Sequence, residues 1–564
     1  MSEASTLLSM LRARLGPRLL QGTTLDQSGA VLAEVPRAEL RDAASFVHSG
    51  LDARFVISVG TDCRPAGDGF RVDHVFSQDR RKTWILLRAY APADDPSVPS
   101  ITPLVPAAGW AEREFQDLLG IRAEGHPDPR RLVLPDDWPE ALHPLRRDVP
   151  YDVHPEPASG TAPPLAAPPD GAMAVPIGPF FPVLEEPVFI KVFADGEEVV
   201  GLDYRGFFNH RGIEKLGDSK LTYNEVPFVA ERICGICGFV HSTAYVQALE
   251  NAAGIEAPLR ARYIRSIVLE LERIHSHLLW LGIAGHILGF DTVLMQAWRI
   301  REPVMWLMER MTGNRKSYGM NLVGGVRRDV PKGEHAEILR VLERVEKEWR
   351  KVVEAVLEDA TLLMRLSKVG VLSTLTAREL GSVGPTARGS NRPIDVRIDH
   401  PYAAYDRIEV KGVWKESCDA AGRTLVRLEE ALESIRQVRQ LLAEMPDGPL
   451  MHVFDEALPP GREGVSAVEA GRGEVIHYVM TGEDARPYRW RVRAPTYANL
   501  QALSASLQGM SIADVPITLG SMDPCFSCTE RMQVLDVRSG DVRVYSPGEL
   551  KQMARAAGRG RGRR

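Results

Sequence analysis

Two Cys-x-x-Cys pairs, far apart in the chain, place the strongest constraint on what this sequence can fold into. The chain has six cysteines in 564 residues, and four of them form the pairs Cys234–Cys237 and Cys525–Cys528. A Cys-x-x-Cys turn can direct two sulfur atoms at one metal ion, and two such turns supply four thiolates. This soft ligand set suits zinc, iron–sulfur clusters or nickel. A shared metal site therefore requires a fold that brings two remote segments together.

Three simpler interpretations of the cysteines compete with a shared site. A zinc ribbon separates its pairs by about 15–20 residues, whereas Cys237 and Cys525 lie more than half the chain apart. A thioredoxin-like redox pair needs a βαβ context of its own, and neither pair has one. Buried structural thiols explain one pair, but hardly two pairs flanked by Arg232, His241 and Asp523. A shared metal site is the favoured interpretation.

The residues around the cysteines form two longer signatures. Arg-x-Cys-Gly-x-Cys-x-x-x-His runs from Arg232 to His241, and Asp-Pro-Cys-x-x-Cys-x-x-Arg runs from Asp523 to Arg531. They resemble the signatures of nickel-iron hydrogenase large subunits, specifically the energy-converting, membrane-bound group related to respiratory complex I, which carries an Arg where other hydrogenases have a final His. The resemblance continues in three further segments, 209–215, 321–329 and 488–493. Across nearly its full length the chain is similar to large subunits of the formate hydrogenlyase type, hydrogenase 3 or 4.

The resemblance implies roles for the four cysteines. Cys234 and Cys525 would be terminal nickel ligands, and Cys237 and Cys528 would bridge nickel and iron. The other iron ligands in this family are carbon monoxide and cyanide, installed by accessory proteins. Dihydrogen is a feeble acid, so splitting it requires a metal that polarises it and a nearby base that takes the proton. The expected activity is reversible formation of H2 from protons and low-potential electrons.

Two more residues are expected to serve catalysis. Arg472 lies in a segment, 469–473, that resembles the family's Ala-Pro-Arg-Gly loop, in which a guanidinium overhangs the metals. Gly471 replaces the usual Pro, and a surface Arg in a Gly-rich turn is the alternative. Glu186 lies in a segment that resembles the first proton relay of related hydrogenases. Its carboxyl could carry protons if burial raises its pKa, and without the family it would be a solvated residue before a strand.

Asp523 and His241 are expected to support the metal centre. By its place before the second pair, Asp523 would hydrogen-bond around the cluster. His241 could do the same from the helix that begins after the first pair, although a satisfied core histidine is an equally good interpretation.

The main alternative is a structural or electron-transfer subunit of the NADH-quinone oxidoreductase type without hydrogenase activity, the class to which NAD binding and quinone binding belong. Complex I relatives have Gly-Pro-x-His-Pro where this chain has Phe181 in place of His, and they lack the cysteine pairs. Quinone reduction is therefore not expected in this subunit.

The fold is expected to be multidomain. Residues 1–149 are predicted to form an α+β domain, because short β-branched or aromatic runs are bounded by Gly, Pro and Asp. An amphipathic helix is expected in the segment 1–20, strands at 55–59, 70–76 and 83–90, and helices at 40–50 and 109–119. The charged last third of this domain resembles the thirty-kilodalton subunit of complex I, a docking subunit. That resemblance implies that Arg130, Arg131 and Asp137 pair with neighbouring subunits.

Residues 150–174, rich in Pro, Ala and Gly, are predicted to be a linker. Residues 175–531 are predicted to form a mainly α-helical domain with small β-sheets, similar to the forty-nine-kilodalton subunit of complex I. Apolar residues recur at helical spacing in 258–312, 336–366 and 420–445. Strands are expected at 189–193, 197–204, 475–481 and 489–493. Long helices that each bury one stripe make a bundle, a rigid frame on which distant cysteines can meet.

The composition and the expected partners indicate where in the cell the protein works. The net charge of −6 gives no electrostatic case for nucleic acid. The N-terminus lacks the apolar core of a signal peptide, and no apolar run reaches the roughly 18 residues of a membrane span. The expectation is a cytoplasmic protein held on the membrane by partners. The family implies a small subunit with a four-iron cluster, similar to the twenty-kilodalton subunit of complex I, together with ferredoxin-like subunits, antiporter-like membrane subunits and a formate dehydrogenase. No iron–sulfur cluster is expected in this chain.

The end of the chain, residues 532–564, is predicted to be an extension that is removed on maturation. Large subunits of this type resemble precursors cleaved after the second signature, here between Arg531 and Met532. The resemblance also implies nickel-insertion proteins and a maturation protease as transient partners.

Overall fold

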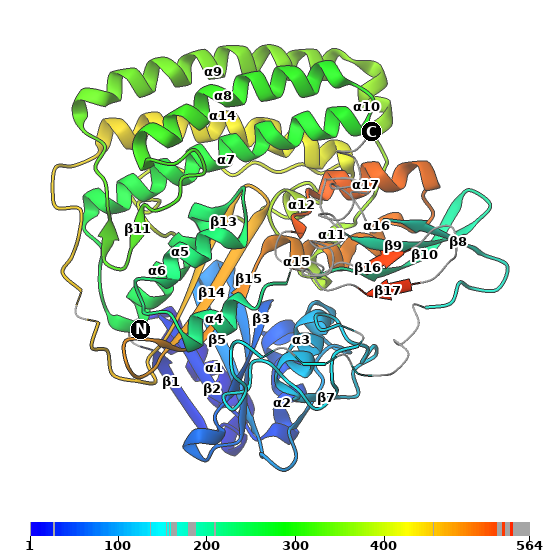
Figure 1. The fold of residues 1–564 in the computed structure, drawn as a ribbon, viewed down its shortest axis with the longest axis vertical. Helices are drawn as coiled ribbons and strands as arrows, with labels where there is room; N and C mark the ends of the chain where they lie inside the picture. The colour runs from blue at the N-terminus through cyan, green and yellow to red at the C-terminus, as the bar shows by residue number, and fades with distance from the viewer. Residues whose placement is uncertain are drawn as a thin grey trace, which may run out of the picture.

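The computed structural model describes residues 2–25, 29–135, 137–153, 155–156, 158, 166–178, 188–207, 210–454 and 456–526, and the backbone of β16 (Gln533–Leu535) and β17 (Val542–Val544). A helical layer lies at the top of the view in Figure 1, and the N-terminal α+β region lies at the bottom. Between them lies the three-stranded sheet of β13 (Glu463–Ala470), β14 (Gly473–Thr481) and β15 (Pro487–Arg493), which we call the central sheet. The predicted fold class, an α+β region joined to a mainly helical region with small sheets, is confirmed.

The N-terminal region contains a five-stranded sheet in the order β1-β2-β5-β4-β3. Its strands are β1 (Gln21–Leu25), β2 (Ala30–Glu34), β3 (Arg54–Asp62), β4 (Phe70–Gln78) and β5 (Thr83–Ala91), and only β2 and β5 pair in parallel. Its helices are α1 (Glu3–Leu15), α2 (Leu40–Ser45) and α3 (Gly109–Leu119), with a short pair of strands, β6 (Ser97–Pro99) and β7 (Arg122–Glu124). The predicted helix at 40–50 is α2 continued by a π-helical turn at Phe46–Gly50.

Both faces of this sheet pack against other parts of the chain. Successive side chains of a strand point to opposite faces, and those of β2 join two different apolar clusters. Val31 and Ala33 of β2 pack with the helices of the N-terminal region, whereas Leu32 joins a second apolar cluster. That second cluster includes Val465 and Ile476 from the C-terminal half of the chain. The N-terminal sheet therefore packs on one side against very distant parts of the sequence.

The helical layer is formed by four long helices: α7 (Leu259–Ile287), α8 (Asp291–Thr312), α9 (Lys332–Glu358) and α14 (Ala420–Glu444). The predicted helical stretch at 258–312 is divided between α7 and α8, because the chain turns at Gly289 in the left-handed region (φ 84°) that favours glycine. The stretch at 336–366 is likewise divided into α9 and α10 (Ala360–Leu366). Among the described helices, none combines the length and apolar character that crossing a membrane requires.

Two sheets and several short helices lie below the long helices. The strands are β8 (Met173–Ile177), β9 (Phe189–Asp195) and β10 (Glu198–Arg205) in one sheet, and β13 (Glu463–Ala470), β14 (Gly473–Thr481) and β15 (Pro487–Arg493) in the other, with the short pair β11 (Asn321–Leu322) and β12 (Gly325–Val326). The helices are α4 (Ile213–Ser219), α5 (Val226–Ala230), α6 (Gly238–Ala253), α11 (Thr374–Glu379), α12 (Gly384–Arg388), α13 (Val396–Asp399), α15 (Pro495–Asn499), α16 (Leu503–Leu507) and α17 (Val515–Met522).

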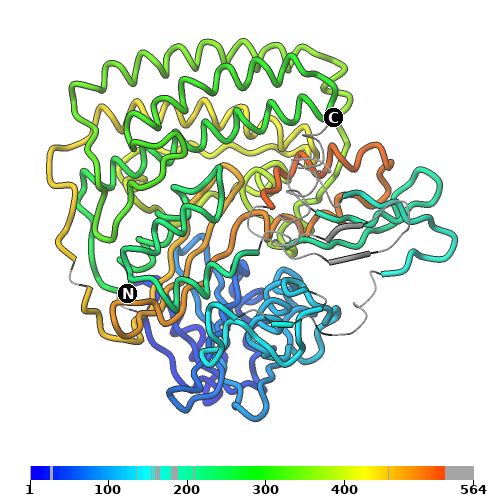
Figure 2. Tube along the Cα trace, viewed as in Figure 1, coloured from blue at the N-terminus to red at the C-terminus, as the bar shows by residue number. Residues whose placement is uncertain are grey.

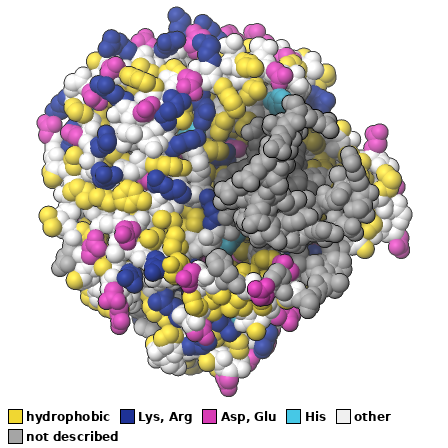
Figure 3. Space-filling view, in the orientation of Figure 1, with side chains coloured by type: hydrophobic (Ala, Val, Ile, Leu, Met, Phe, Trp, Pro, Cys, Tyr) yellow, Lys and Arg dark blue, Asp and Glu magenta, His cyan; other side chains and the backbone are white. Residues whose placement is uncertain are grey.

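The surface of the molecule carries charges of both signs. On the face shown in Figure 3, basic and acidic side chains are interspersed, in keeping with the small net charge. Exposed ion pairs link the long helices, as Arg299 of α8 pairs with Glu348 of α9 at 2.8 Å. An exposed pair contributes little to stability, because water and salt screen it. The helical layer is therefore stabilised mainly by its buried apolar stripes.

The N-terminal region joins the central sheet through its edge strand. An edge strand presents unpaired backbone groups, and here arginine side chains cover them. Arginines occupy every second position of β15, and the Nε of each donates to every second carbonyl of β3: Arg489 to Gly60 (2.8 Å), Arg491 to Ser58 (3.3 Å) and Arg493 to Val56 (3.2 Å). We call these three residues the arginine ladder. Figure 2 shows the blue N-terminal strands beside the orange strands of the central sheet.

Buried ion pairs reinforce the same contact. Arg54 of β3 binds both oxygens of Glu474 in β14 (2.8 and 2.9 Å), and Glu474 also pairs with Arg493. Arg491 is bidentate to Glu114 of α3 (2.7 and 2.8 Å). Burial alone would raise the pKa of Glu474, but Arg54 and Arg493 outweigh it and lower that pKa to about 2. The pairing therefore keeps Glu474 charged at neutral pH.

The predicted assembly surface is wrong at Arg130 and Arg131. Arg130 is bidentate to Asp203 of β10 (2.8 and 3.2 Å) and also binds Asp128. Arg131 donates to the carbonyls of Pro135 and Trp138 (2.7 and 2.6 Å). The chain satisfies both guanidinium groups itself, which the charge pattern alone could not reveal. The role of Asp137 stays a prediction.

Candidate metal centre

The fold brings the two cysteine pairs to one buried place. The Sγ atoms of Cys234 and Cys525 lie 3.3 Å apart, and the backbone N–H of Cys237 donates to Cys234 Sγ at 3.3 Å. All three cysteines are at most 5% exposed. The two sulfurs are too far apart for a disulfide, but one metal at about 2.3 Å can reach both. Cys528 lies outside the described residues.

Local structure aims the cysteines inward. Cys234 follows a 3-10 turn at Glu231–Ile233, and Cys237 directly precedes α6, so the first pair spans the entry to a buried helix. Cys525 follows α17, whose C-cap residue Asp523 has a left-handed backbone (φ 54°). That conformation suits Asp and Asn better than most residues. It turns the chain sharply toward the first pair.

The donor set fits a metal. Contact with Cys237 and burial raise the pKa of the Cys234 thiol well above its ordinary value. Thiolates at such a site require a compensating cation, which a bound metal supplies. Two soft sulfur ligands at this separation, with a third beside them, suit zinc, iron or nickel.

Arg472 is buried beside the cysteines. It occupies the two-residue turn between β13 and β14 and is 4% exposed. Its Nη2 donates to Asp523 Oδ1 at 2.9 Å, and its Nε donates to the Asp523 carbonyl at 3.0 Å. The alternative of a surface arginine is wrong. Burial opposes its charge, but Asp523 and the nearby thiols outweigh burial and raise the pKa of Arg472. The side chain is a fixed cation at the cysteines.

A close backbone approach fixes the turn that carries Arg472. Gly473 (φ 126°) lies against Gly384 at the start of α12, where a Cβ on Gly384 would stand 2.3 Å from Gly473 Cα. Only glycine at both positions allows this contact. Gly471, where the family pattern has Pro, faces Ser276 of α7, and a Cβ there would lie 2.9 Å from Ser276 Oγ. The turn is thus held from two sides without the proline.

His241 is buried in α6 and hydrogen-bonds another histidine. Trp490 Nε1–H donates to His477 Nδ1 at 3.1 Å, so His477 carries its proton on Nε2 and donates it to His241 Nδ1, also at 3.1 Å. His241 Nε2 has no hydrogen-bond partner among the described residues. Burial lowers the pKa of His241 to about 3, so the ring is neutral.

Four expected site residues lie outside the described residues: Glu186, Cys528, Arg531 and Met532. Their predicted roles stay predictions.

Sequence reasoning missed two buried arginines of α14, Arg423 and Arg427. Both are fully buried on the face of α14 that packs against α7 and α17. The signal was present: Arg423, Arg427 and Glu430 recur at helical spacing, on a face that the apolar stripe marks as buried. Charged residues on an apolar stripe are the exception that indicates a site.

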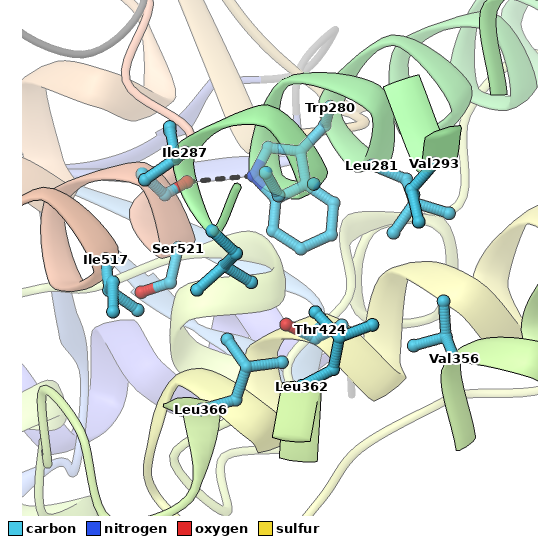
Figure 4. Close-up of a pocket in the computed structure, with 14 residues that line it drawn as sticks. Trp280, Leu281, Ile287, Val293, Val356, Leu362, Leu366, Thr424, Ile517 and Ser521 are labelled. Atoms are coloured by element: carbon cyan, nitrogen blue, oxygen red, sulfur yellow. Dashed lines mark hydrogen bonds between the residues drawn. The ribbon is translucent and has the colours of Figure 1, made fainter. Parts of the chain in front are cut away.

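Two cavities border the segment 517–526, which contains Cys525. One of about 100 Å³ reaches Cys525 and is walled by Trp110 and Glu114 of the N-terminal region and by Arg491 of the arginine ladder. A smaller, apolar one of about 30 Å³ lies between the long helices and α17 (Figure 4). There Trp280 of α7 donates to the Gly520 carbonyl of α17 at 2.8 Å, the dashed line in Figure 4. This bond ties α7 to the helix that precedes Cys525.

Comparison with known proteins agrees with this geometry. The family models that match describe the respiratory-chain NADH dehydrogenase 49 Kd subunit (residues 288–464 and 450–531), its 30 Kd subunit (33–155) and nickel-dependent hydrogenase (211–291). Formate hydrogenlyase subunit 5 of Escherichia coli K12 is 41% identical over 91% of each chain. The membrane-bound hydrogenase subunit alpha of Pyrococcus furiosus is 39% identical over 67% of this chain and 92% of its own.

A solved structure shares the fold. A chain of the membrane-bound sulfane sulfur reductase, an archaeal respiratory membrane complex, is 30% identical with a TM-score of 0.61, and the match covers 65% of this chain and all of that one. The fold and the cysteine site define a nickel-iron hydrogenase large subunit of the complex I-related kind. The chain belongs to the family of formate hydrogenlyase subunit 5.

Proposed function

We propose that this chain is the catalytic large subunit of a membrane-attached, multisubunit hydrogenase of the formate hydrogenlyase type, and that it forms H2 from protons and low-potential electrons. The observation that carries the proposal is the convergence of Cys234 and Cys525 at 3.3 Å in a buried site beside Arg472. The names of its relatives, a formate hydrogenlyase subunit and a membrane-bound hydrogenase subunit, support the setting.

The proposed cofactor is a nickel-iron centre whose iron also carries carbon monoxide and cyanide. Cys234 and Cys525 would hold nickel, and Cys237 and Cys528 would bridge it to iron. When bound, this centre supplies an electron-rich metal pair that polarises H2. The nickel-dependent hydrogenase match at residues 211–291 supports the metal.

The surrounding residues would orient charge and exclude water. Arg472 would present a fixed cation to the centre, because its Nε and Nη2 are held by Asp523 and a guanidinium stays charged. The burial of the cysteines keeps bulk water away, which strengthens these interactions. Glu186 would take the proton and pass it outward.

Electrons would arrive through a partner. Arg232 and Gly235, next to the first pair, are exposed, so the turn that carries Cys234 reaches the surface. A small subunit with a four-iron cluster would dock there, with ferredoxin-like and antiporter-like subunits and a formate dehydrogenase beyond it. The large subunit would then be held on the cytoplasmic face of the membrane by these partners.

The extension after Arg531 would be removed once nickel is inserted. Before cleavage, nickel-insertion proteins and then a protease would act on the full-length chain, in which the Sγ of Cys525 already lies 3.3 Å from that of Cys234. Intact-mass measurement should find a chain shortened by residues 532–564 in active enzyme.

Elemental analysis and infrared spectroscopy test the proposal. The purified complex should contain nickel and iron, show bands from metal-bound carbon monoxide and cyanide, and evolve H2 from a reduced viologen dye. A NADH-quinone oxidoreductase-type subunit would contain neither nickel nor these bands, and a zinc-binding scaffold would contain zinc alone. Either result would overturn the proposal.

A further inference from the structure

Arg423 and Arg427 project from one face of α14 toward the segment that ends in Cys525. Arg423 donates to Ser521 Oγ and to the Gly370 carbonyl, both at 2.8 Å. Arg427 donates from Nη1 to the Arg423 carbonyl at 3.0 Å, and its guanidinium lies over the ring of Trp280, 4.3 Å from the centroid. Both arginines are fully buried.

Neither arginine has a carboxylate at hydrogen-bond distance within the described part of the chain. The Nε of Arg427 is 4.0 Å from Asp523 Oδ2, and among the described residues no carboxylate lies within 4.0 Å of Arg423. Glu430, one turn further along α14, has both carboxylate oxygens hydrogen-bonded elsewhere, to Arg388 at 2.7 Å and to His277 at 2.9 Å.

Several N–H donors are therefore left over at one place. Arg427 Nε and Nη2, Arg423 Nη1 and Arg472 Nη1 are buried and have no hydrogen-bond partner among the described residues. Because Arg427 uses Nη1 on α14 and has Nε nearest to Asp523, the edge formed by Nε and Nη2 faces Asp523.

Leaving buried guanidinium groups unpaired is costly. A buried ion without a partner costs several kcal/mol of desolvation, and buried polar groups in folded proteins are nearly always satisfied. Burial lowers the pKa of Arg427 to about 10 and that of Arg423 to about 9, so both remain cations at neutral pH. Glu430 and Asp419 also act on Arg427 and Arg423, but neither carboxylate lies within 4.0 Å of them in the described part of the chain, so a further negative group would stabilise both cations.

Asp523 connects this charge to the cysteines. It lies between Arg472, at 2.9 Å, and Arg427, at 4.0 Å, and it stands two residues before Cys525. Arg423 holds the same segment through Ser521, two residues before Asp523. Three guanidinium groups thus meet a short segment with one carboxylate, and the next anions along the chain are the thiolates.

We propose that Arg427 is a second cationic positioning residue of the metal centre: with Arg472 it brackets Asp523, and with Arg423 behind it, it balances the negative charge of the thiolate-bound metals. This inference rests on the proposed nickel-iron centre. The anionic group it serves is the metal centre with its thiolate and cyanide ligands.

The first experiment compares stability in the metal-free, full-length chain. Arg427→Met removes a buried charge whose partner is absent without metal, so the thermal midpoint should stay the same or rise. The matched control is Arg260→Met. Arg260 is also a buried arginine of the long helices, about 30 Å from Trp280 along α7, but it is paired with Asp329 at 2.7 Å and donates to the Pro446 and Val330 carbonyls. The control should lower the midpoint by several degrees.

The second experiment uses the metal-loaded complex. Here Arg427→Met should lose the advantage seen without metal, shift the cyanide infrared bands and lower the midpoint potential of the nickel signal, since a cation near a metal favours its reduced form. Arg427→Lys, which keeps the charge, should return the bands and the potential most of the way to the wild-type values. Arg260→Met should leave both unchanged.

The outcomes separate the inference from the proposed function. If Arg427→Met destabilises the metal-free chain as much as Arg260→Met, Arg427 is a structural residue and the inference fails. If the loaded complex shows the bands but they do not move in Arg427→Met, a bridging water satisfies the donors and the inference fails alone. If the wild-type complex holds neither nickel nor the bands, the proposed function and the inference fall together.

Discussion

The buried arginines at the contact between the N-terminal region and the central sheet differ in their partners from those around Asp523. In the arginine ladder and its neighbours, each guanidinium meets carbonyls or carboxylates of this chain, as Arg54 meets Glu474 and Arg491 meets Glu114. Around Asp523, Arg423 and Arg427 keep donors that the described residues leave unmatched. The first group is complete without a ligand, and the second is not.

The difference shows how a structural arginine can be told from one that serves a ligand. Burial is the same in both groups, so burial alone does not distinguish them. The completeness of the partners does, because a chain that satisfies its own charges gains nothing from a ligand at that place.

Removing a thiolate should have the largest effect. Cys525→Ser or Cys234→Ser removes a soft ligand from the proposed centre, so nickel should be absent by elemental analysis and H2 evolution should fall below detection. Cys418→Ser, at a half-buried cysteine apart from the cluster, should keep both. Full nickel content in Cys525→Ser would show that Cys525 is not a ligand of the nickel centre.

Arg472→Gln should lower H2 evolution by about 10²–10³-fold, the usual cost of removing one preorganised donor from a reacting centre. Nickel and iron content should stay at the wild-type level, since the ligands are untouched. Arg472→Lys should recover only part of the rate, because it keeps the charge and loses the fork geometry. Loss of metal in Arg472→Gln would instead show that Arg472 is needed to build the site and not only to act on the bound centre.

Glu474→Gln should destabilise the metal-free chain by about 3 kcal/mol, because it leaves Arg54 and Arg493 buried without their shared carboxylate. Denaturant unfolding measures the effect. Glu348→Gln, which breaks an exposed pair with Arg299, should produce no measurable change. A stability close to wild type in Glu474→Gln would show that the ladder contact tolerates uncompensated arginines as well as the metal centre does.

The same pair predicts a dependence on pH. The folded-state pKa of Glu474 is about 2, below its ordinary value of 4.5, so its contribution is complete above pH 4.5 and is lost as the pH falls toward 2. The difference in thermal midpoint between wild type and Glu474→Gln should therefore be constant near neutrality and shrink below pH 4.5. A difference that stays constant down to pH 2 would contradict the ion-pair explanation.

Gly471→Ala should have the smallest effect. The added Cβ meets Ser276 Oγ at 2.9 Å, a side chain that can shift, so about 1 kcal/mol of stability should be lost, and H2 evolution should fall only a few-fold. Gly333→Ala, in the first turn of α9 with nothing within 4 Å, should be neutral or slightly stabilising. A large loss of activity in Gly471→Ala would mean that the turn carrying Arg472 tolerates no displacement.

Much of the fold follows from the sequence because its patterns are local. The predicted helix at 109–119 is α3, and the predicted strand at 70–76 lies within β4 (Phe70–Gln78). These patterns depend on residues a few positions apart. The strands β1 and β2 were not predicted, because Gln21–Leu25 has no alternation of apolar residues and is held by its pairing with β2.

The site was predictable only where a motif reports it. The cysteine pairs are recognisable by their spacing, and Arg472 is recognisable because its loop resembles the family pattern. Arg427 has no motif, and its unmatched donors become visible only when Trp280 and Asp523 lie beside it. The partners of Arg130 and Arg131 were predicted on other subunits for the same reason: a distant carboxylate such as Asp203 leaves no trace near them in the sequence.

The arginine ladder also has a consequence for synthesis. The strand β3 leaves the ribosome early, with its outer carbonyls open, and the residue that covers Gly60 follows 429 positions later. Until β15 is made, this edge is a template to which a strand of another nascent chain could add. Production of active enzyme should therefore depend on translation speed and on chaperones that shield the early half of the chain.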